Sequence, residues 1–256
     1  IQDLIEIGDQ WSVLLAARYD EYEDDFFVAG DLLRESSSDN LTPRAGFVYK
    51  PAENISIYAS YSESFEPNGI VTDSSYSNFG EQLDPTTGEQ IELGAKAEFF
   101  EKRLLLTGAV FEAYRSNIPF NDDVELVTDQ RGEQKHQGIE LSVAGLINDN
   151  ISLISSFAYL DAEFTEDDDP DIIGNTPAGA AEISASLWAE YQITSGPLEN
   201  LSIQGGWFYE DERSGDNDNS FILDSYHRFD MGLKYVWQFS ESTPVTFRLT
   251  ASTLFD

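Results

Sequence analysis

The stretch Gln90-Ile91-Glu92-Leu93-Gly94-Ala95-Lys96-Ala97-Glu98-Phe99 alternates apolar or small residues with polar ones along most of its length. Successive side chains of a β-strand point to opposite faces, so residues two apart share a face. One face of this segment would carry Ile91 and Leu93, and the other would carry Glu92 and Lys96. The pattern therefore predicts a strand with one apolar and one wet face.

The same period of two recurs along the chain and predicts about eleven strands. Each segment is about as long as a tilted strand needs to be to cross a bilayer. No segment shows sustained helical spacing, and no apolar run is long enough for a transmembrane helix. The ten further segments are 11–20, 44–50, 55–62, 104–114, 136–145, 151–161, 182–191, 201–210, 228–237 and 245–254.

The connections between these segments alternate strictly between short and long. The short ones are 50–54, 101–103, 148–150, 194–200 and 240–244. The long polar ones are 21–43, 63–89, 115–134, 165–180 and 211–225. Outer-membrane barrels have tight periplasmic turns at one end and longer extracellular loops at the other. A water-soluble sheet protein would need a second layer to cover so many apolar faces. We therefore predict an all-β, transmembrane, antiparallel up-and-down β-barrel.

Aromatic residues support the prediction that the long connections are extracellular. If the long connections are extracellular, aromatic side chains gather at both ends of the predicted apolar faces, as in the girdles at membrane interfaces. The periplasmic group is Trp11, Phe47, Tyr49, Phe99, Tyr191, Tyr235 and Trp237. The outer group is Tyr19, Tyr61, Tyr159 and Tyr209.

The composition excludes several classes of function. The chain of 256 residues contains no cysteine, which argues against disulfides, cysteine-ligated metals and a cysteine nucleophile. Its 48 acidic and 14 basic residues give a net charge of −34, so we expect no nucleic-acid binding. The acidic runs 20–25, 166–171 and 211–218 offer oxygen atoms to calcium, but without an ordered calcium-loop spacing we expect solvated charge.

Catalysis is not expected. The two histidines, His136 and His227, lie near the predicted outer ends of strands. A serine nucleophile needs an adjacent base, and Ser225 lies near His227 only in an ordinary junction between a loop and a strand. We predict that the protein is not an enzyme and that it has neither a cofactor nor a metal site.

The predicted inward positions mix acids, bases and small residues, as expected for a polar ladder that wets a barrel interior. They include Arg18, Arg44, Glu92, Lys96, Glu112, Glu140, Glu190, Lys234 and Arg248. Contact of these inward residues with a substrate or a plug domain is the functional alternative.

Large apolar or cationic residues in the long connections are candidates for holding an anionic, aromatic-rich small molecule. Packing between loops is the alternative role for each of them. These candidates are Phe65, Tyr76, Phe79, Arg115, Phe120, Arg131 and Arg213.

Several segments resemble, in order, the barrel of TonB-dependent receptors for ferric siderophores. The resemblance covers nearly the whole chain, and its strength lies in the ordered series of segments. The last segment resembles the family's Asn-Leu-Phe-Asp, with Thr253 in place of Asn. The segments are 41–46, 57–65, 83–96, 132–141, 158–163, 175–177, 215–217 and 253–256.

The resemblance implies a 22-stranded barrel closed by an N-terminal plug that couples to TonB. About eleven consecutive strands fit the larger barrels, which enclose a plugged lumen. Residues 1–256 are then expected to be the C-terminal half of the barrel, with the plug domain, the signal peptide and the final strand outside the chain.

The implied function is import of a ferric siderophore across the outer membrane of a Gram-negative bacterium. The expected partners are the ferric chelate, TonB through the missing N-terminal part, and outer-membrane lipid, and we expect a monomer. Two alternatives remain open, namely a passive porin-type channel and a TonB-dependent receptor for another substrate such as cobalamin or a glycan.

Overall fold

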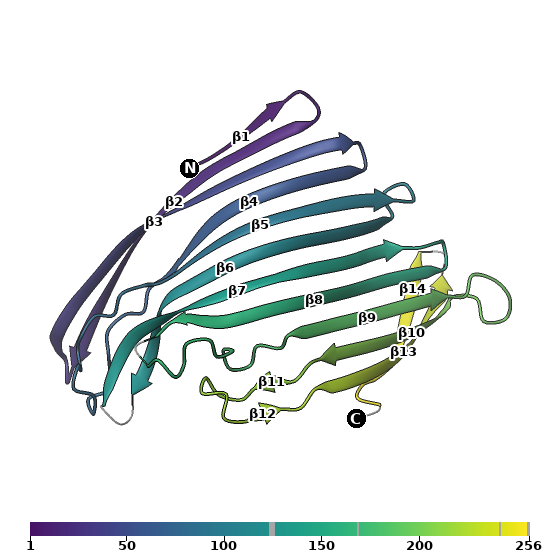
Figure 1. The fold of residues 1–256 in the computed structure, drawn as a ribbon. Helices are drawn as coiled ribbons and strands as arrows, with labels where there is room; N and C mark the ends of the chain where they lie inside the picture. Colours follow the sequence, from purple (N-terminus) through teal and green to yellow (C-terminus); the bar gives the residue numbers. More distant parts are fainter. Residues whose placement is uncertain (123–125, 168, 241, 255–256) are drawn as a thin grey trace.

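The computed structural model describes residues 1–122, 126–167, 169–240 and 242–254. Within them, twelve antiparallel strands form one curved sheet in which each strand pairs with the next along the chain (Figure 1). The strands are β1 (Gln2–Ile7), β2 (Trp11–Val28), β3 (Asp31–Ala52), β4 (Ile55–Glu66), β5 (Thr86–Phe99), β6 (Leu104–Asp122), β7 (Val127–Leu146), β8 (Ile151–Glu166), β9 (Ile183–Gln192), β10 (Leu201–Glu210), β13 (Tyr226–Ser240) and β14 (Thr243–Ala251). A separate two-stranded ribbon pairs β11 (Arg213–Ser214) with β12 (Ile222–Leu223). No helix among the described residues is long and apolar enough to cross a membrane.

The up-and-down meander confirms the predicted fold class, and every predicted strand is present. The prediction of about eleven strands omitted β1. This strand pairs with β2 from Ile7↔Trp11 to Gln2↔Ala16, and Gly8, with a φ of 61°, helps to close the turn between them. The alternation of residues 1–7 was visible in the sequence, but the segment is shorter than the other strands.

Two of the five predicted long loops are largely strands, which corrects the sequence analysis. Pairing of β2 with β3 continues to Val28↔Asp31, and pairing of β6 with β7 continues to Asp122↔Val127. Residues 21–43 therefore form a long hairpin closed by Ala29 and Gly30, both with positive φ, as type I′ turns require. Both faces of these extensions carry polar residues, so the apolar alternation that marks a lipid-facing strand is missing.

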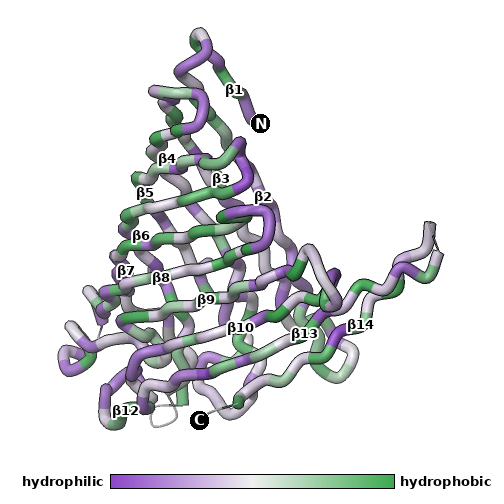
Figure 2. The backbone as a smooth tube through the Cα atoms, turned by 90° about the vertical axis from the view of Figure 1, so that its right-hand side faces the viewer, coloured by the Kyte–Doolittle hydropathy of each residue, from purple (hydrophilic) through white to green (hydrophobic). Residues whose placement is uncertain are grey.

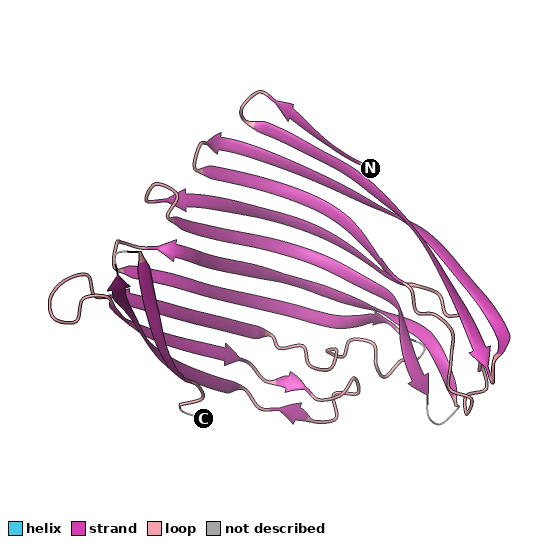
Figure 3. Ribbon diagram, turned by 180° about the vertical axis from the view of Figure 1, so that it is seen from behind, coloured by secondary structure: helices cyan, strands magenta, loops and turns pink. Residues whose placement is uncertain are grey.

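The other three long connections lie at the same edge of the sheet as the two hairpin tips, and the short turns lie at the opposite edge (Figure 3). The connections run from residue 67 to 85, from 167 to 182, and from 211 to 225, the last containing β11 and β12. The predicted alternation of short and long connections is thus confirmed, although two of the long connections are largely strand hairpins.

The two faces of the sheet differ in polarity. Paired residues share a face, and Leu93 pairs with Ala59 and Val110 on a face of exposed apolar side chains. Leu93 is 54% exposed there. The opposite, concave face carries Glu92, which lines a recess with side chains from β4 to β9. Figure 2 shows the resulting mixture of apolar and polar positions along each strand. The apolar surface thus faces outward, as a lipid-facing barrel wall requires.

Glu112 departs from the predicted inward set. It pairs with Ile91 and Gln137, so it lies on the outward face. Its carboxylate is 3.0 Å from the Nζ of Lys135, on the same face. The alternation along β6 continues to the upper edge of the apolar band, where an outward position accommodates a charge. The register places the other eight predicted residues on the concave face.

Candidate functional site

The seven candidate residues do not converge on one site. Phe65 and Arg115 border one recess at the extracellular end of β4 to β6. Arg213 borders a different recess, of about 320 Å³, beside β8 and β11. The remaining four lie in the connection from β4 to β5 or in the distal part of the β6–β7 hairpin, namely Tyr76, Phe79, Phe120 and Arg131.

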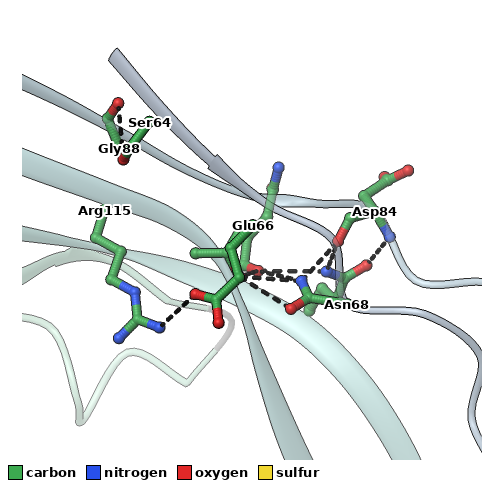
Figure 4. A network of polar contacts seen from close by, with 9 residues as sticks. Ser64, Glu66, Asn68, Asp84, Gly88 and Arg115 are labelled. Carbon is green, nitrogen blue, oxygen red and sulfur yellow. Dashed lines mark hydrogen bonds and ion pairs between the residues drawn. The ribbon is translucent and has the colours of Figure 1, made fainter. Parts of the chain in front are cut away.

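The recess beside Arg115 measures about 580 Å³ and opens on the concave face. Arg115 pairs with Gly88, and Gly88 pairs with Ser64, so these three residues share that face. The Nη2 of Arg115 lies 3.9 Å from a carboxylate oxygen of Glu66, and the two side chains are 51% and 72% exposed (Figure 4). An ion pair this exposed contributes little to stability. Arg115 can therefore exchange Glu66 for a ligand at small cost.

Phe65 borders the same recess, but its pairing with Thr87 places it on the face opposite that of Arg115. It is half-buried. Alternation along β4 explains this separation, since Phe65 directly follows Ser64. The structure therefore brings the two candidates to one recess from opposite faces of the sheet.

A polar network beside the recess was not anticipated from the sequence. Thr86 is 4% exposed, and its hydroxyl donates to the carbonyl of Asn117 at 3.0 Å. The Nδ2 of Asn68 donates to the carbonyl of Asp84 at 2.7 Å and to Oγ1 of Thr86 at 3.0 Å (Figure 4). Gln130 also bonds to Asp84. The network ties the ends of the β4–β5 connection to β6 and β7, and so fixes the edge of the recess. The segment 83–96, which carries part of the family resemblance, contains Asp84 and Thr86 of this network.

The β6–β7 hairpin bends beside this network. Asn117 and Gly132 lie opposite each other, have φ values of 58° and 85°, and are left out of the run of paired residues. A Cβ atom at Gly132 would lie 3.0 Å from the carbonyl oxygen of Glu166. Glycine is therefore required at 132 both for its left-handed backbone and for the close approach of β8.

Phe79 packs within the extracellular segments. Its ring lies edge-on to Phe26 of the β2–β3 hairpin, with centroids 5.6 Å apart. Asn78 donates to the carbonyl of Thr128 at 2.6 Å and accepts from the backbone N–H of Thr128 at 3.1 Å. Gln82 donates to the carbonyl of Ser37 at 2.9 Å. The connection thus bridges two hairpins, and Phe79 makes a contact between them; its role in ligand binding stays a prediction.

Tyr76 lies in a turn of the same connection, where its backbone N–H donates to the carbonyl of Asp73 at 3.2 Å. Phe120 lies on β6 opposite Asp129 and is 39% exposed. Arg131 lies on β7 opposite Ile118, and its side chain is outside the described part of the molecule. Neither Tyr76 nor Phe120 borders the recess beside Arg115.

The side chain of Arg213 contacts two residues of its own chain. Its Nη1 lies 2.9 Å from a carboxylate oxygen of Glu210, and its guanidinium stands 5.9 Å from the ring centroid of Tyr226. Nearby, Asn219 accepts from the N–H of Thr176 at 3.0 Å and donates to the carbonyl of Thr176 at 2.7 Å. Asn175 also donates to the carbonyl of Asn217 at 3.0 Å, so the family-like segments 175–177 and 215–217 lie side by side, and Thr176 borders the second recess.

Polar side chains on the concave wall below the recesses contact one another. The hydroxyl of Tyr58 donates to Glu92 at 2.5 Å, and the Nζ of Lys96 lies 5.3 Å from the Tyr58 ring centroid. Lys234 pairs with Glu190, which also accepts from Gln204. The Lys234–Glu190 pair neutralises two charges within the wall, and the other contacts hold Glu92 and Lys96 beside the Tyr58 ring.

Among the described residues, no three His, Cys, Asp or Glu side chains group so as to hold a metal ion. His136 lies on the concave face above the apolar band. Burial, and secondarily the charge of Arg115, lowers the pKa of His136. The geometry therefore describes the wall of a membrane barrel with a polar interior and a recess at its extracellular mouth.

Comparison with known proteins agrees with this class. The family described as "TonB dependent receptor-like, beta-barrel" matches residues 1–252. The chain is 31% identical to the metal-pseudopaline receptor CntO of Pseudomonas aeruginosa over 92% of the chain and 34% of that protein. It is 32% identical to the ferrichrome outer membrane transporter/phage receptor of Escherichia coli K12, over 88% of the chain and 30% of that protein. The crystal structure of the siderophore receptor PiuA from Acinetobacter baumannii superposes with a TM-score of 0.80 at 28% identity, covering 97% of this chain and 37% of that one.

This chain belongs to the TonB-dependent receptor β-barrel family, and it is a segment of an outer-membrane protein. The chain spans about a third of the length of the curated relatives that it matches. Proteins of this family are receptors and transporters.

Proposed function

We propose that the receptor containing this chain imports a ferric siderophore across the outer membrane with energy from the TonB system. The observation that carries the proposal is the identity of 28–32% with proteins named as receptors or transporters for ferrichrome, ferrioxamine B and other siderophores. Iron arrives inside the chelate, so the barrel needs no metal ligands of its own. We further propose that residues 1–256 are the C-terminal half of the barrel, that a plug and the TonB contact lie in the N-terminal part, and that the receptor acts as a monomer.

Transport is tested with the full-length gene in a Gram-negative host that lacks its own siderophore receptors. Uptake of radioactive iron from a panel of ferric chelates is measured with and without functional TonB. We expect uptake of at least one chelate, and its loss without TonB. Uptake that persists without TonB, together with a large conductance in planar bilayers, would identify a passive porin. Tight binding of cobalamin or a glycan, with no chelate bound, would reject the siderophore while retaining the family.

Within this function, we propose that Arg115 contributes to the ligand site. Support comes from its position in the recess and from its weak, exposed pairing with Glu66. A hydrogen bond from a charged donor contributes about 1.5–3 kcal/mol, so Arg115→Ala should weaken chelate binding by roughly ten-fold or more. Arg103→Ala is the matched control, because Arg103 is bound to Asp149 at the periplasmic turn. Equal affinities in both variants would remove Arg115 from the site. The roles of Phe65, Tyr76, Phe79, Phe120, Arg131 and Arg213 stay predictions that the same binding assay can test.

A further inference from the structure

Arginines on three strands gather on the concave face at the extracellular mouth. Arg44 on β3 and Arg115 on β6 both border the recess of about 580 Å³. Arg44 also borders a second recess, of about 310 Å³, together with Arg18 on β2. Arg18 pairs with Thr42, two residues before Arg44, so the two arginines share the concave face. The two recesses therefore adjoin at Arg44.

The space between Arg44 and Arg115 is kept open by the side chains below it. Three strand spacings separate β3 from β6, a distance of about 14 Å. Gln90, in the row between them, donates to Glu92 at 3.1 Å and so is turned toward the periplasmic side. No aromatic or large aliphatic side chain interrupts the row of paired residues that leads from Arg44 to β6, which consists of Ser62, Gln90 and Ala113.

The arginines differ in how far carboxylates of the chain already compensate their charge. The Nη2 of Arg18 lies 2.6 Å from Oδ1 of Asp20, whereas Arg115 meets Glu66 only at 3.9 Å. Arg44 is exposed, and no described carboxylate forms an ion pair with it. Positive charge is thus in excess here, although the chain has 48 acidic and only 14 basic residues.

The other carboxylates that border these two recesses belong to the opposite face of the sheet. Glu63 pairs with Glu89, and the hydroxyl of Tyr61 donates to Glu63 at 2.6 Å. Glu21 pairs with Asp39 on the same outward face. An anion on the concave side lies closer to the arginines than to these carboxylates, and Coulomb energy falls with distance. The recesses therefore attract an anion.

We propose that Arg44 anchors an anionic group of the ferric chelate, that Arg115 and Arg18 donate to the same ligand from either side, and that the receptor thereby selects chelates of net negative charge. The inference rests on the proposed import of a ferric siderophore. A guanidinium presents five N–H donors in a fork that matches oxyanions. Arg44 has no ion pair to give up, and the exposed pairs of Arg18 and Arg115 are weak enough to exchange.

The test measures the binding of ferric chelates of known charge to the full-length receptor by quenching of its tryptophan fluorescence. One series keeps the iron coordination constant: a linear ferric trihydroxamate ending in a protonated amine, its neutral N-acetyl derivative and its negative N-succinyl derivative. A trianionic ferric tris-catecholate extends the series. We expect the tightest binding from a negative member, roughly ten-fold tighter binding of the succinyl than of the amine form, and weakening with added salt.

Arg44→Gln removes the charge and keeps a hydrogen-bonding side chain. It should weaken binding of the negative chelate roughly ten-fold and leave binding of the neutral one within about two-fold. Arg44→Lys keeps the charge and should retain most of the preference for negative chelates. Arg248→Gln is the matched control, because Arg248 lies on the concave face opposite Lys234 and borders neither recess. The unfolding midpoint of each variant in guanidinium chloride reports its folding separately.

Tightest binding of the neutral or the positive chelate by the wild type would overturn the proposal. Equal losses for all chelates in Arg44→Gln would also overturn it, because they would show a role in the fold or in plug contact and none in recognition of charge. Equal effects of Arg44→Gln and Arg248→Gln would do the same. A receptor that binds no ferric chelate at all would reject the proposed siderophore import itself, and this inference with it.

Discussion

Leu141→Arg tests the assignment of the outward face to lipid. Leu141 is 48% exposed and lies between Gly108 and Phe157 on that face. It stands five residues above Leu146, the periplasmic end of β7. Five residues span about 17 Å along a strand, or roughly 13 Å along the membrane normal at a tilt of about 40°. This places Leu141 near the middle of an apolar band about 25 Å tall, where an arginine costs about 2–4 kcal/mol.

Two control variants isolate the cause. Ser142→Arg places the same charge at nearly the same depth on the concave face, beside Thr107 and Ser156. Gln137→Arg keeps the outward face but lies near the upper limit of the apolar band, where Gln137 donates to Asp161 at 2.8 Å and a charge costs little. We expect each control to change the free energy of unfolding by less than about 1 kcal/mol, because both positions are wet.

The measurement is the equilibrium unfolding of the full-length receptor in lipid vesicles by guanidinium chloride, followed by tryptophan fluorescence. Only Leu141→Arg should shift the midpoint strongly toward lower denaturant. If Leu141→Arg and Ser142→Arg destabilise the protein equally, depth and not facing determines the cost, and the assigned faces are wrong. If Gln137→Arg is as damaging as Leu141→Arg, the apolar band extends higher than we infer.

Three further predictions concern single residues outside the bilayer. Lys102→Gly should raise the free energy of unfolding by about 1 kcal/mol relative to Lys102→Ala, because Lys102 has a φ of 68° in the β5–β6 turn; an unchanged value in the same denaturant titration would contradict this. Thr86→Val should speed amide hydrogen exchange in the β4–β5 connection, since removing the donor leaves the carbonyl of Asn117 without this bond; Thr86→Ser is the control that keeps it. The pKa of His136 is lowered in the folded state, so its contribution to stability is full above the unfolded value of about 6.5 and is lost as pH falls below it. His136→Gln should reduce that loss when unfolding is measured between pH 7 and pH 5, and a pH profile identical to that of the wild type would reject the assignment.

The sequence alone determined the fold class, because the period of two is a local consequence of strand geometry. Alternation such as that in 90–99 needs no tertiary information to indicate a strand with one lipid-facing side. The alternation of short and long connections then determined which end of each strand faces the cell exterior. The identity of the family followed from an ordered series of short segments, each of which depends on local sequence only.

Only the tertiary structure decided where the extracellular residues lie. Polar residues on both faces of 21–43 predict a loop, so cross-strand pairing and not hydropathy defines this hairpin. Local alternation predicts an inward Glu112, and the register with Ile91 places it outward. Arg115 meets Glu66 only after β4, β5 and β6 are aligned. Such contacts join residues tens of positions apart, and they depend on register and on loop docking, which no local pattern encodes.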